Sequence, residues 1–372
     1  MSKLIVNAIR HTGASSDAVT LASDGTCTAN ITNNLSNRNL IINGAAQINQ
    51  RGNQTGISSG GTNYTLDRWS LSLVNGGTWN ISQSTDTPDG FGNSIKLECT
   101  TADTSLGASD YLLLRQKIEG QNVQAFAKGT SSAKQFAVSF YLKTNKTGVY
   151  TIELRDNNNS RTCGKTITVS NSNWNRYTLI FPADTTGVFD NNNADSLQLN
   201  IWLAAGSDRT SGTLQTAWGS QTNANRVLSS NVNLADNTSN EFYLTGVQLE
   251  VGSVATDFEH RSFGQELALA RRYYFGNVGN GLFGVGRTTN ASTMWSIQFP
   301  TEMRVNPSMS LTSTTVTISE PNAANFDVTS ATLADAHGGT TSKAFYLNGT
   351  MSVSPGDNLF LTTNYLKFDA EL

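Results

Sequence analysis

Apolar and polar side chains alternate over long stretches between residues 64 and 203. A period of two is typical of β-strands that bury one face, and Gly, Asn, Asp and Ser separate the runs as turn residues. The alternating apolar positions are Trp69/Leu71/Leu73, Trp79/Ile81, Ile95/Leu97/Cys99, Leu112/Leu114/Ile118, Phe136/Val138/Phe140/Leu142, Tyr150/Ile152/Leu154, Ile167/Val169, Tyr177/Leu179/Phe181 and Leu197/Leu199/Ile201/Leu203. A polar stretch from 206 to 240 interrupts the pattern before FYLTGVQLEV supplies a closing strand. These strands predict an antiparallel β-sandwich, and we expect a jelly roll.

A second β pattern begins near residue 276 and continues to residue 372. The glycine-rich stretch GNVGNGLFGVG leads into the runs TMWSIQF, SLTSTTVTIS, KAFYLNGTMSV and DNLFLTTNYLKF. Trp295, Ile297 and Phe299 share one parity, so we expect them in a core. The sequence therefore predicts a second, smaller β domain over residues 276–372.

One short helix is predicted between the two β regions, at about residues 262–274. Ser262 followed by Gln265 forms a capping box, and good helix formers come directly after it. Two apolar stripes follow from the helical period: Phe263, Leu267, Ala270 and Tyr274 on one, and Leu269 and Tyr273 on the other. We expect one stripe to pack on the sandwich and the other on symmetry mates, so that residues 260–275 form a junction and trimerisation helix.

The first 37 residues contain two short β-like pieces, KLIVNAI and DAVTLASDGTCTANI. They hold too few apolar residues to close a core, so we expect this segment to pack on a partner or on copies of itself. The resulting division is 1–37 as an attachment segment, 38–259 as the sandwich, 260–275 as the helix and 276–372 as the distal domain.

Composition and charge argue against several partners. The net charge of -3 gives no electrostatic reason to expect nucleic acid, and no apolar run is long enough for membrane insertion or a signal peptide. Charged residues make up only 14% of the chain, and Asn, Ser, Thr and Gln supply the remaining polarity. Such a surface suits an extracellular β protein. The three cysteines are far apart, and we expect Cys99 to be a buried apolar residue rather than a disulfide partner.

Four segments carry a resemblance to a known family. They are NRNLIINGAAQINQRG (37–52), YTLDRW (64–69), LTGVQLEVGSVATDFEHRSFGQELALARRYY (244–274) and YLKFDAEL (365–372). Together they resemble bacteriophage tail-fibre and receptor-binding proteins, especially those of marine and cyanobacterial phages. Two positions depart from the family pattern: Ala46 stands where Met is usual, and Ala270 where Cys is usual.

The resemblance implies a homotrimeric virion component. Its N-terminal segment would bind phage tail or adaptor proteins, and its distal end would contact a host surface glycan or outer-membrane receptor. The protein would be made in the host cytoplasm and released by lysis, which accounts for an extracellular composition without a secretion signal. A purely structural virion protein, such as a head fibre or tail connector, is the alternative, and a glycan-degrading tail enzyme is the third possibility.

No catalytic, metal or cofactor site is predicted. GNGLFG (279–284) matches a dinucleotide-binding pattern but follows a helix instead of a strand. DNNNSR (156–161) and DNNNAD (190–195) resemble calcium loops without the glutamate at position 12, so only a structural calcium of another kind stays open. His11, His260 and His337 are too scattered to form a metal triad. No pair of carboxylates stands out for glycoside hydrolysis, so we expect adhesion without catalysis.

A candidate glycan site lies on the strand SLQLNIWLA. Its inner face takes Leu197 and alternate residues after it, which places Trp202 outside with Gln198 and Asn200. An aromatic ring beside two amides is typical of a sugar site, although the same face could instead be buried against a neighbouring subunit. Trp218, in the polar stretch, is a second exposed candidate.

The distal domain offers further candidates. Tyr346 lies between two inward residues and should face outward, and the loop ADAHGGTT (334–341) with His337 should reach solvent. Loops on a rigid scaffold commonly carry recognition, so we expect residues 276–372 to meet the host. The sequence does not identify the receptor, the host or the place on the virion, and it leaves open whether the sandwich binds sugar.

Overall fold

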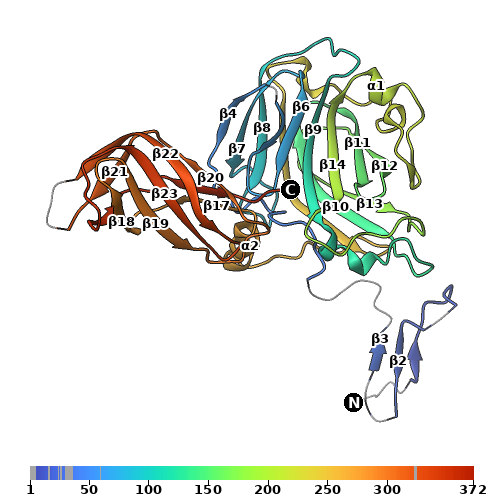
Figure 1. Cartoon of the computed structure of the whole chain (residues 1–372). Helices are drawn as coiled ribbons and strands as arrows, with labels where there is room; N and C mark the ends of the chain where they lie inside the picture. Colours follow the sequence, from blue (N-terminus) through green and yellow to red (C-terminus); the bar gives the residue numbers. More distant parts are fainter. Residues whose placement is uncertain are drawn as a thin grey trace.

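The computed structural model describes residues 6–15, 17–23, 25, 27–29, 37–58, 60–321 and 325–372. Figure 1 shows an N-terminal hairpin unit, a large β-sandwich and a second β unit joined to the sandwich beside the helix α2. The hairpin unit contains β1 (Ala8–Ile9), β2 (Val19–Leu21) and β3 (Cys27–Ala29), paired antiparallel. Ile9 and Leu21 are exposed in it, so these apolar side chains are not buried by the described part of the chain.

Two antiparallel sheets form the sandwich. In spatial order, the six-stranded sheet contains β13 (Asn175–Phe181), β10 (Phe136–Thr144), β16 (Glu241–Val251), β8 (Ser94–Thr101), β7 (Thr78–Ser84) and β4 (Gln54–Ile57). The seven-stranded sheet contains β15 (Gly219–Ser220), β12 (Arg161–Val169), β11 (Gly148–Asp156), β14 (Asp195–Ala205), β9 (Tyr111–Glu119), β6 (Ser70–Val74) and β5 (Gly61–Tyr64). The predicted jelly-roll sandwich is confirmed.

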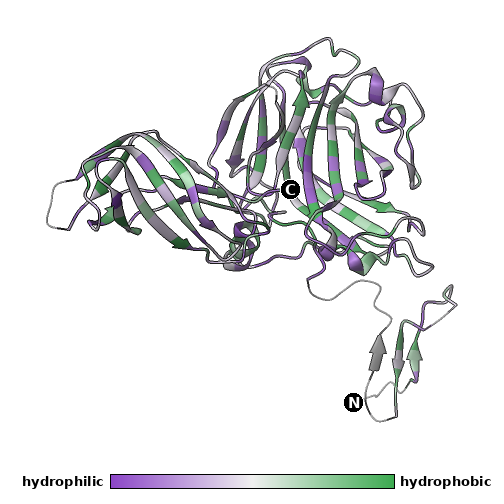
Figure 2. Cartoon of the chain, viewed as in Figure 1, coloured by the Kyte–Doolittle hydropathy of each residue, from purple (hydrophilic) through white to green (hydrophobic). Residues whose placement is uncertain are grey.

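The period-two pattern explains the sandwich core. On β14 the inner residues Leu197, Leu199 and Ile201 are fully buried, and Trp69 and Trp79 are equally buried between the sheets. Figure 2 shows hydrophobic and hydrophilic residues alternating along the strands of both sheets. Each strand therefore presents one apolar face to the other sheet, as the sequence predicts.

The polar stretch from 206 to 240 does not add a long strand to either sheet. It contains the short helix α1 (Ser207–Thr210), β15 and the 3₁₀ turns η3 (Asn223–Asn225) and η4 (Leu234–Asp236). Two further 3₁₀ turns, η1 (Gly120–Asn122) and η2 (Gln124–Phe126), follow β9.

The C-terminal unit is a closed six-stranded barrel with a small sheet attached. Around the barrel the order is β18 (Phe283–Thr288), β19 (Ser292–Gln298), β23 (Ser342–Thr350), β22 (Phe326–Gly338), β21 (Val316–Ser319) and β24 (Asn358–Leu361). A three-stranded sheet of β17 (Tyr274–Val278), β25 (Leu366–Asp369) and β20 (Ser308–Leu311) lies next to the sandwich. Trp295 and Phe345 are buried in the barrel core. The expected smaller β domain is confirmed, and its closure into a barrel is new.

The helix α2 (Phe263–Arg271) is present with its predicted cap and ends earlier than expected. Gln265 N donates to Ser262 Oγ at 3.3 Å, and Ser262 N donates to Gln265 Oε1 at 3.1 Å, which completes the capping box. Tyr274 already belongs to β17, where it pairs with Asp369. Pairing with β25 supplies main-chain hydrogen bonds that continuing the helix would remove.

The two predicted stripes of the helix have different surroundings from those expected. Ala270, Tyr273 and Tyr274 are buried within the chain, so their expected contact with a partner copy is corrected. Phe263 is 60% exposed and Leu269 is 37% exposed, and Leu267 is half-buried. Of the six predicted interface residues, only these three keep apolar surface that a partner copy can cover.

The four segments that resemble tail-fibre proteins meet at the junction between the sandwich and the barrel unit. Asn39 Nδ2 donates to Val247 O at 3.1 Å, and Gln50 Nε2 donates to Tyr274 O at 2.9 Å. Gly44 lies so close to β16 that a Cβ atom on it would be 2.2 Å from Val247 O. Any larger residue would displace the backbone there, which explains the glycine in the first segment.

Buried ion pairs complete this junction. Arg68, 1% exposed, forms a salt bridge with Glu371, and its guanidinium carbon lies 3.5 Å from the centre of the Tyr273 ring. Arg272 donates from Nε and Nη2 to the two carboxylate oxygens of Glu119, each at 2.8 Å, and the Tyr273 hydroxyl also donates to Glu119. The segments of the resemblance are therefore structural: they hold the two β units together.

Candidate functional site

The predicted glycan platform on β14 has the expected orientation but is not exposed. Trp202, Gln198 and Asn200 all lie on the outer side of the seven-stranded sheet, opposite the core residues of the same strand. Their exposed fractions are nevertheless 1%, 2% and 0%. The expectation that Trp202 is available to a ligand is wrong.

The polar stretch from 206 to 240 covers Trp202. Val227 and Leu113 pack with the Trp202 ring in a small apolar cluster, and the Arg226 guanidinium lies 4.9 Å from the ring centre. Arg226 also donates from Nε and Nη2 to Glu153, at 2.8 and 2.7 Å, and Trp202 Nε1 donates to Glu153 Oε2 at 3.2 Å. The cover comes from the same chain rather than from a neighbouring subunit.

Trp218 is also less available than expected. It is half-buried, its Nε1 donates to Pro182 O at 2.9 Å, and its ring centre lies 5.4 Å from that of Phe136 at the edge of the sandwich core. These contacts hold the indole against the sandwich, so the expected second exposed platform is corrected.

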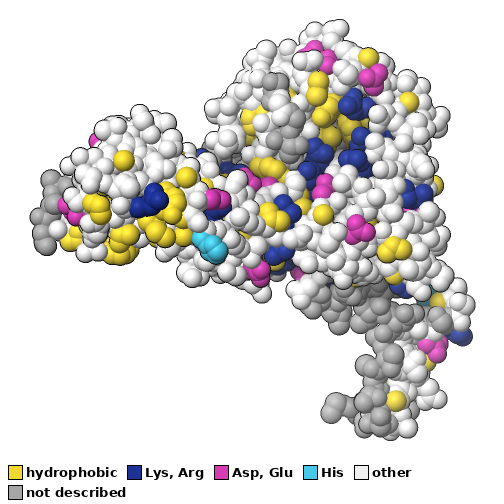
Figure 3. Space-filling model, viewed as in Figure 1, with side chains coloured by type: hydrophobic (Ala, Val, Ile, Leu, Met, Phe, Trp, Pro, Cys, Tyr) yellow, Lys and Arg dark blue, Asp and Glu magenta, His cyan; other side chains and the backbone are white. Residues whose placement is uncertain are grey.

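A group of cationic side chains lies on the same outer face, further along the strands. In register, Arg115 on β9 is opposite Asn200, and Gln198 is flanked by Lys117 on β9 and Arg155 on β11. We call Arg115, Lys117 and Arg155, above Gln198 and Asn200, the cationic face. Figure 3 shows Lys and Arg side chains gathered over the middle of this sheet. All three cations are partly exposed, whereas the two amides beneath them are buried.

Two guanidinium groups converge on one neutral oxygen at the centre of the cationic face. Arg115 Nη1 and Arg155 Nη1 each donate to Gln198 Oε1 at 3.4 Å. Gln198 Nε2 in turn donates to Asp195 Oδ2 at 2.6 Å. Lys117 Nζ lies 3.8 Å from the same Asp195 oxygen. The amide therefore bridges the two arginines and the Asp195 carboxylate.

The titration of these groups reflects burial and mutual repulsion. Burial lowers the pKa of Arg155, and the nearby charge of Arg226 lowers it further. Burial also lowers the pKa of Lys117, with only partial compensation from Asp195. For Asp195 itself burial raises the pKa, and the surrounding cations offset this only in part. Positive charge is thus concentrated here at a cost in solvation.

Sequence reasoning missed these residues although the signal was available. In LLLRQKI the leucines and isoleucine of one parity form the core, which places Arg115 and Lys117 on the outer face. In YTIELRD the same alternation places Arg155 outside. Only the pairing of β9 and β11 on either side of β14 brings them together, and single-strand periodicity does not give strand order.

The distal candidates lie on two different parts of the barrel. Tyr346 is half-buried between buried Phe345 and Leu347, as its parity predicts, and the Arg287 guanidinium lies 4.4 Å from its ring centre. His337 is exposed near the end of β22. Most of the expected loop 334–341 is strand, because β22 continues to Gly338 and β23 begins at Ser342.

An exposed apolar surface lies beside Tyr346 on the outside of the barrel. Phe283 is 50% exposed, Phe360 and Met294 are each 38% exposed, and Val285 is 36% exposed. Phe283 pairs with Phe360, Val285 with Met294, and Met294 with Tyr346, so the surface is continuous across four strands. We call Phe283, Val285, Met294 and Phe360 the barrel ridge. Figure 3 shows hydrophobic side chains gathered on this part of the barrel.

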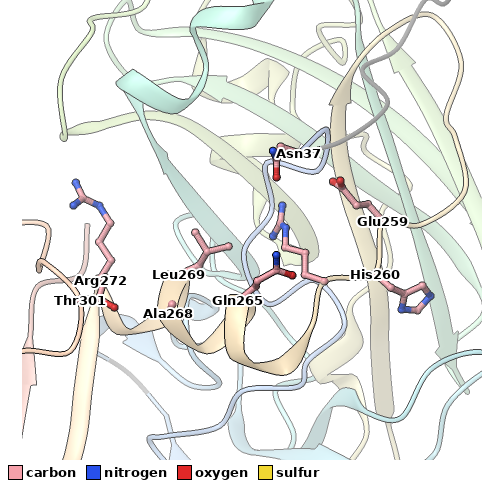
Figure 4. Close-up of a pocket in the computed structure, with 9 residues that line it drawn as sticks. Asn37, Glu259, His260, Gln265, Ala268, Leu269, Arg272 and Thr301 are labelled. Atoms are coloured by element: carbon pink, nitrogen blue, oxygen red, sulfur yellow. The ribbon is translucent and has the colours of Figure 1, made fainter.

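A pocket of about 550 Å³ lies beside α2, on the side where residue 37 enters the sandwich. Figure 4 shows the side chains around it, which are Asn37, Glu259, His260, Arg261, Gln265, Ala268, Leu269, Arg272 and Thr301. Leu269 and Ala268 give it an apolar wall, and Leu269 is one of the expected interface residues. The role of Phe263, Leu267 and Leu269 in a trimer stays a prediction.

The remaining sequence candidates show no further chemistry. Asp156, from the first Asn-rich loop, is buried and forms an ion pair with Lys128 Nζ at 2.5 Å, which occupies one of its oxygens. Among the described residues, no group of three or more His, Cys, Asp or Glu side chains could hold a metal ion. In the same part of the chain, no helix is long and apolar enough to cross a membrane.

No protein-family model matches the sequence, and no curated protein matches it either. Among solved structures, the enzymatically active domain of tailspike protein 4 of bacteriophage CBA120 is similar over 57% of this chain and 21% of its own chain, with 15% identity and a TM-score of 0.31. The family 11 carbohydrate-binding module from Clostridium thermocellum, in complex with a β-1,3-1,4-mixed-linked tetrasaccharide, is similar over 56% of this chain and 99% of its own, with 11% identity and a TM-score of 0.28.

The CBM22-1 xylan-binding domain from Paenibacillus barcinonensis Xyn10C is similar over 61% of this chain and 100% of its own, with 11% identity and a TM-score of 0.29. A phage tailspike domain and carbohydrate-binding modules are thus among the solved structures that this chain partly resembles. At such TM-scores and identities, no ligand or reaction of these proteins carries over to this chain.

Proposed function

We propose that the chain is a homotrimeric bacteriophage tail fibre that attaches the virion to a host surface glycan without catalysis. The observation that carries the binding role is the barrel ridge, an apolar surface with two exposed phenylalanines on the outside of the barrel. Contiguous exposed apolar surface commonly marks an interaction site. The resemblance of residues 244–274 to tail-fibre proteins supports the virion role.

The chemistry of the barrel ridge suits a saccharide. The rings of Phe283 and Phe360 lie edge to face with their centres 5.5 Å apart, and both can pack against the C–H face of a sugar ring. Asn358 is exposed and is in register with Val285, so its amide can hydrogen-bond hydroxyl groups. Tyr346 and Arg287 provide a polar border on the other side.

The N-terminal hairpin unit is the proposed attachment point to the tail or an adaptor protein. Its exposed apolar side chains, Ile9 and Leu21, would be covered in that contact. The fibre would be made in the host cytoplasm and released with the virion by lysis. Three copies per fibre would raise the effective affinity roughly a hundredfold or more when they bind together.

The test is binding of the purified full-length chain to host cells and to an array of bacterial surface polysaccharides. We expect the double substitution Phe283→Ala and Phe360→Ala to weaken cell binding at least about tenfold, because each ring loses its contact with the sugar. The matched control is Val188→Ala, which truncates an exposed apolar side chain on the sandwich and should change nothing.

Two results would count against the proposal. If the unmodified chain binds neither cells nor any polysaccharide, a purely structural virion role is the better explanation. If the double variant binds as well as the Val188 control, the barrel ridge is not the attachment surface.

A further inference from the structure

The cationic face of the sandwich is a feature that the barrel ridge and the proposed attachment do not use. Its two arginines, Arg115 and Arg155, share the neutral oxygen of Gln198 at 3.4 Å, the long end of the hydrogen-bonding range. A buried carboxylate on the neighbouring strand, that of Glu153, is already bound by Arg226 through two hydrogen bonds. Both guanidinium groups therefore share one neutral acceptor at the centre of the cationic face.

This arrangement costs stability, because like charges are brought together where solvent is partly excluded. Neutral side chains at the same positions could fill a structural role without this loss of stability. Three cations around the single carboxylate of Asp195 leave an excess of positive charge on this partly exposed face, and such an excess is typical of a site that binds negative charge. Guanidinium groups bind carboxylate, phosphate and sulfate particularly well, because their planar array of donors matches two oxygens at once.

Neighbouring groups indicate what else the ligand carries. Asn200 Oδ1 and Asp195 Oδ1 are buried and have no hydrogen-bond donor among the described residues. Buried acceptors are normally satisfied, and neither atom is accessible to solvent, so a ligand hydroxyl can donate to them only when the side chains that cover them move. Gln221, half-buried beside Arg155, accepts from Arg155 Nε at 2.7 Å, donates one amide hydrogen to Asn223 Oδ1 at 3.2 Å and keeps the other for a further acceptor. An anionic group next to several hydroxyls describes an acidic sugar.

We propose that the cationic face is a second saccharide site, specific for acidic sugars, in which Arg115 and Arg155 bind the acidic group. Lys117 borders the site; its Nζ donates to Leu372 O at 2.6 Å and lies near Asp195, so it contributes long-range attraction more than a direct bond. This site goes beyond the proposed attachment through the barrel ridge, because it binds by charge instead of by apolar contact. The two sites lie on different β units and can be tested separately.

The experiment is calorimetric titration of the full-length chain with three matched ligands. The first is an oligosaccharide of galacturonic acid, the second is the same oligosaccharide with its carboxyl groups reduced to alcohols, and the third is a sulfated neutral oligosaccharide. We expect an acidic form to bind at least about tenfold more tightly than the reduced form, and its affinity to fall with rising salt. Which acidic form binds more tightly separates a carboxylate from a sulfate as the recognised group.

Variants of one arginine connect the binding to this face. Arg155→Gln should weaken binding of the acidic form at least about tenfold while leaving the melting temperature unchanged or higher, because it relieves the repulsion between the two guanidinium groups. Arg155→Lys keeps the charge but loses the planar array of donors, so its affinity for the acidic form should lie between those of the native chain and Arg155→Gln. The matched control is Arg176→Gln, which removes an exposed arginine from the outer face of the six-stranded sheet and should leave binding unchanged.

The proposal is overturned if neither acidic form binds more tightly than the reduced form, or if both Arg155 variants bind like the Arg176 control. Should Arg155→Gln fail to fold, Arg155→Lys alone decides between these outcomes. The Phe283/Phe360 double variant should still bind the acidic oligosaccharide. A native chain that binds the acidic oligosaccharide but not host cells would therefore count only against the attachment proposal, and a native chain that binds host cells but neither acidic form would count only against this one.

Discussion

Whether a single side chain is exposed depends on more than its position in a strand. The alternation in β14 predicts correctly that Trp202 leaves the sandwich core on the outer face. It does not predict that Val227, from a polar stretch with no periodic pattern, covers the ring. Periodicity indicates on which side of a sheet a residue lies. Whether that side is exposed to solvent depends on the path of the loops that pack over it.

A substitution at Trp202 checks this point. Because the ring is 1% exposed and packed against Leu113 and Val227, Trp202→Ala should lower the free energy of unfolding by about 3 to 5 kcal/mol. Urea denaturation followed by circular dichroism measures the change. The control is Trp174→Ala, since removing this half-buried ring should lower the free energy of unfolding by less. A Trp202 variant as stable as the native chain would mean that the ring is not packed as described.

The helix α2 shows how much of an element local sequence determines. Ser262 and Gln265 define its start, since a capping box is a local signal. Its end depends on distant partners: Tyr273 turns toward Glu119, and the Tyr274 backbone pairs with Asp369. These partners are far away in the sequence, so the pattern of apolar residues alone predicts a helix that ends three residues later than α2 does.

Glu119 gives this junction a dependence on pH. Burial alone would raise the pKa of Glu119, but hydrogen bonds from Arg272 and Tyr273 outweigh it and hold the pKa below its usual 4.5. A lowered carboxyl pKa contributes stability that is fully present above pH 4.5 and is lost as the pH falls through the lower, folded-state value. The junction should therefore weaken in acid.

The prediction is that Glu119→Gln lowers the free energy of unfolding by about 3 kcal/mol at pH 7, because it leaves Arg272 without its charged partner. Between pH 5 and pH 3 the variant should lose less stability than the native chain. Chemical denaturation over this range measures both effects. Glu98→Gln affects a more accessible pair, in which Lys96 keeps a second partner in Glu241, and should lower the free energy of unfolding by less than about 1 kcal/mol. Parallel pH profiles for the native chain and the Glu119 variant would rule out this role of Glu119.

At the scale of the whole molecule, the sequence predicts two β units joined by a helix but not how each one closes. The barrel closes through the pairing of Phe283 with Phe360, and no periodicity in either strand indicates that contact. The cationic face likewise depends on strand order, since Arg115 and Arg155 belong to strands on opposite sides of β14. Local patterns give the elements and their buried faces, whereas long-range pairing creates the candidate sites.

Assembly is the prediction that belongs to this scale. The exposed apolar side chains of the hairpin unit and of α2 lead us to expect a trimer, with three times the chain mass of 39.9 kDa. Sedimentation equilibrium measures it. The double substitution Phe263→Glu and Leu269→Glu should shift the mass toward a monomer, whereas Val188→Glu, another exposed apolar position, should not. A native chain that sediments as a stable monomer would contradict the expectation.

The salt bridge between Arg68 and Glu371 has a consequence for synthesis. Its partners are 303 residues apart, and Arg68 is almost completely buried in the finished protein. At the usual rates of translation, Arg68 leaves the ribosome roughly 15 to 60 s before Glu371 does. During this interval Arg68 has no Glu371 to pair with, so its guanidinium stays hydrated and the junction between the two β units cannot form. A chaperone that binds the nascent chain would therefore have access to the surface around Arg68 for most of this interval.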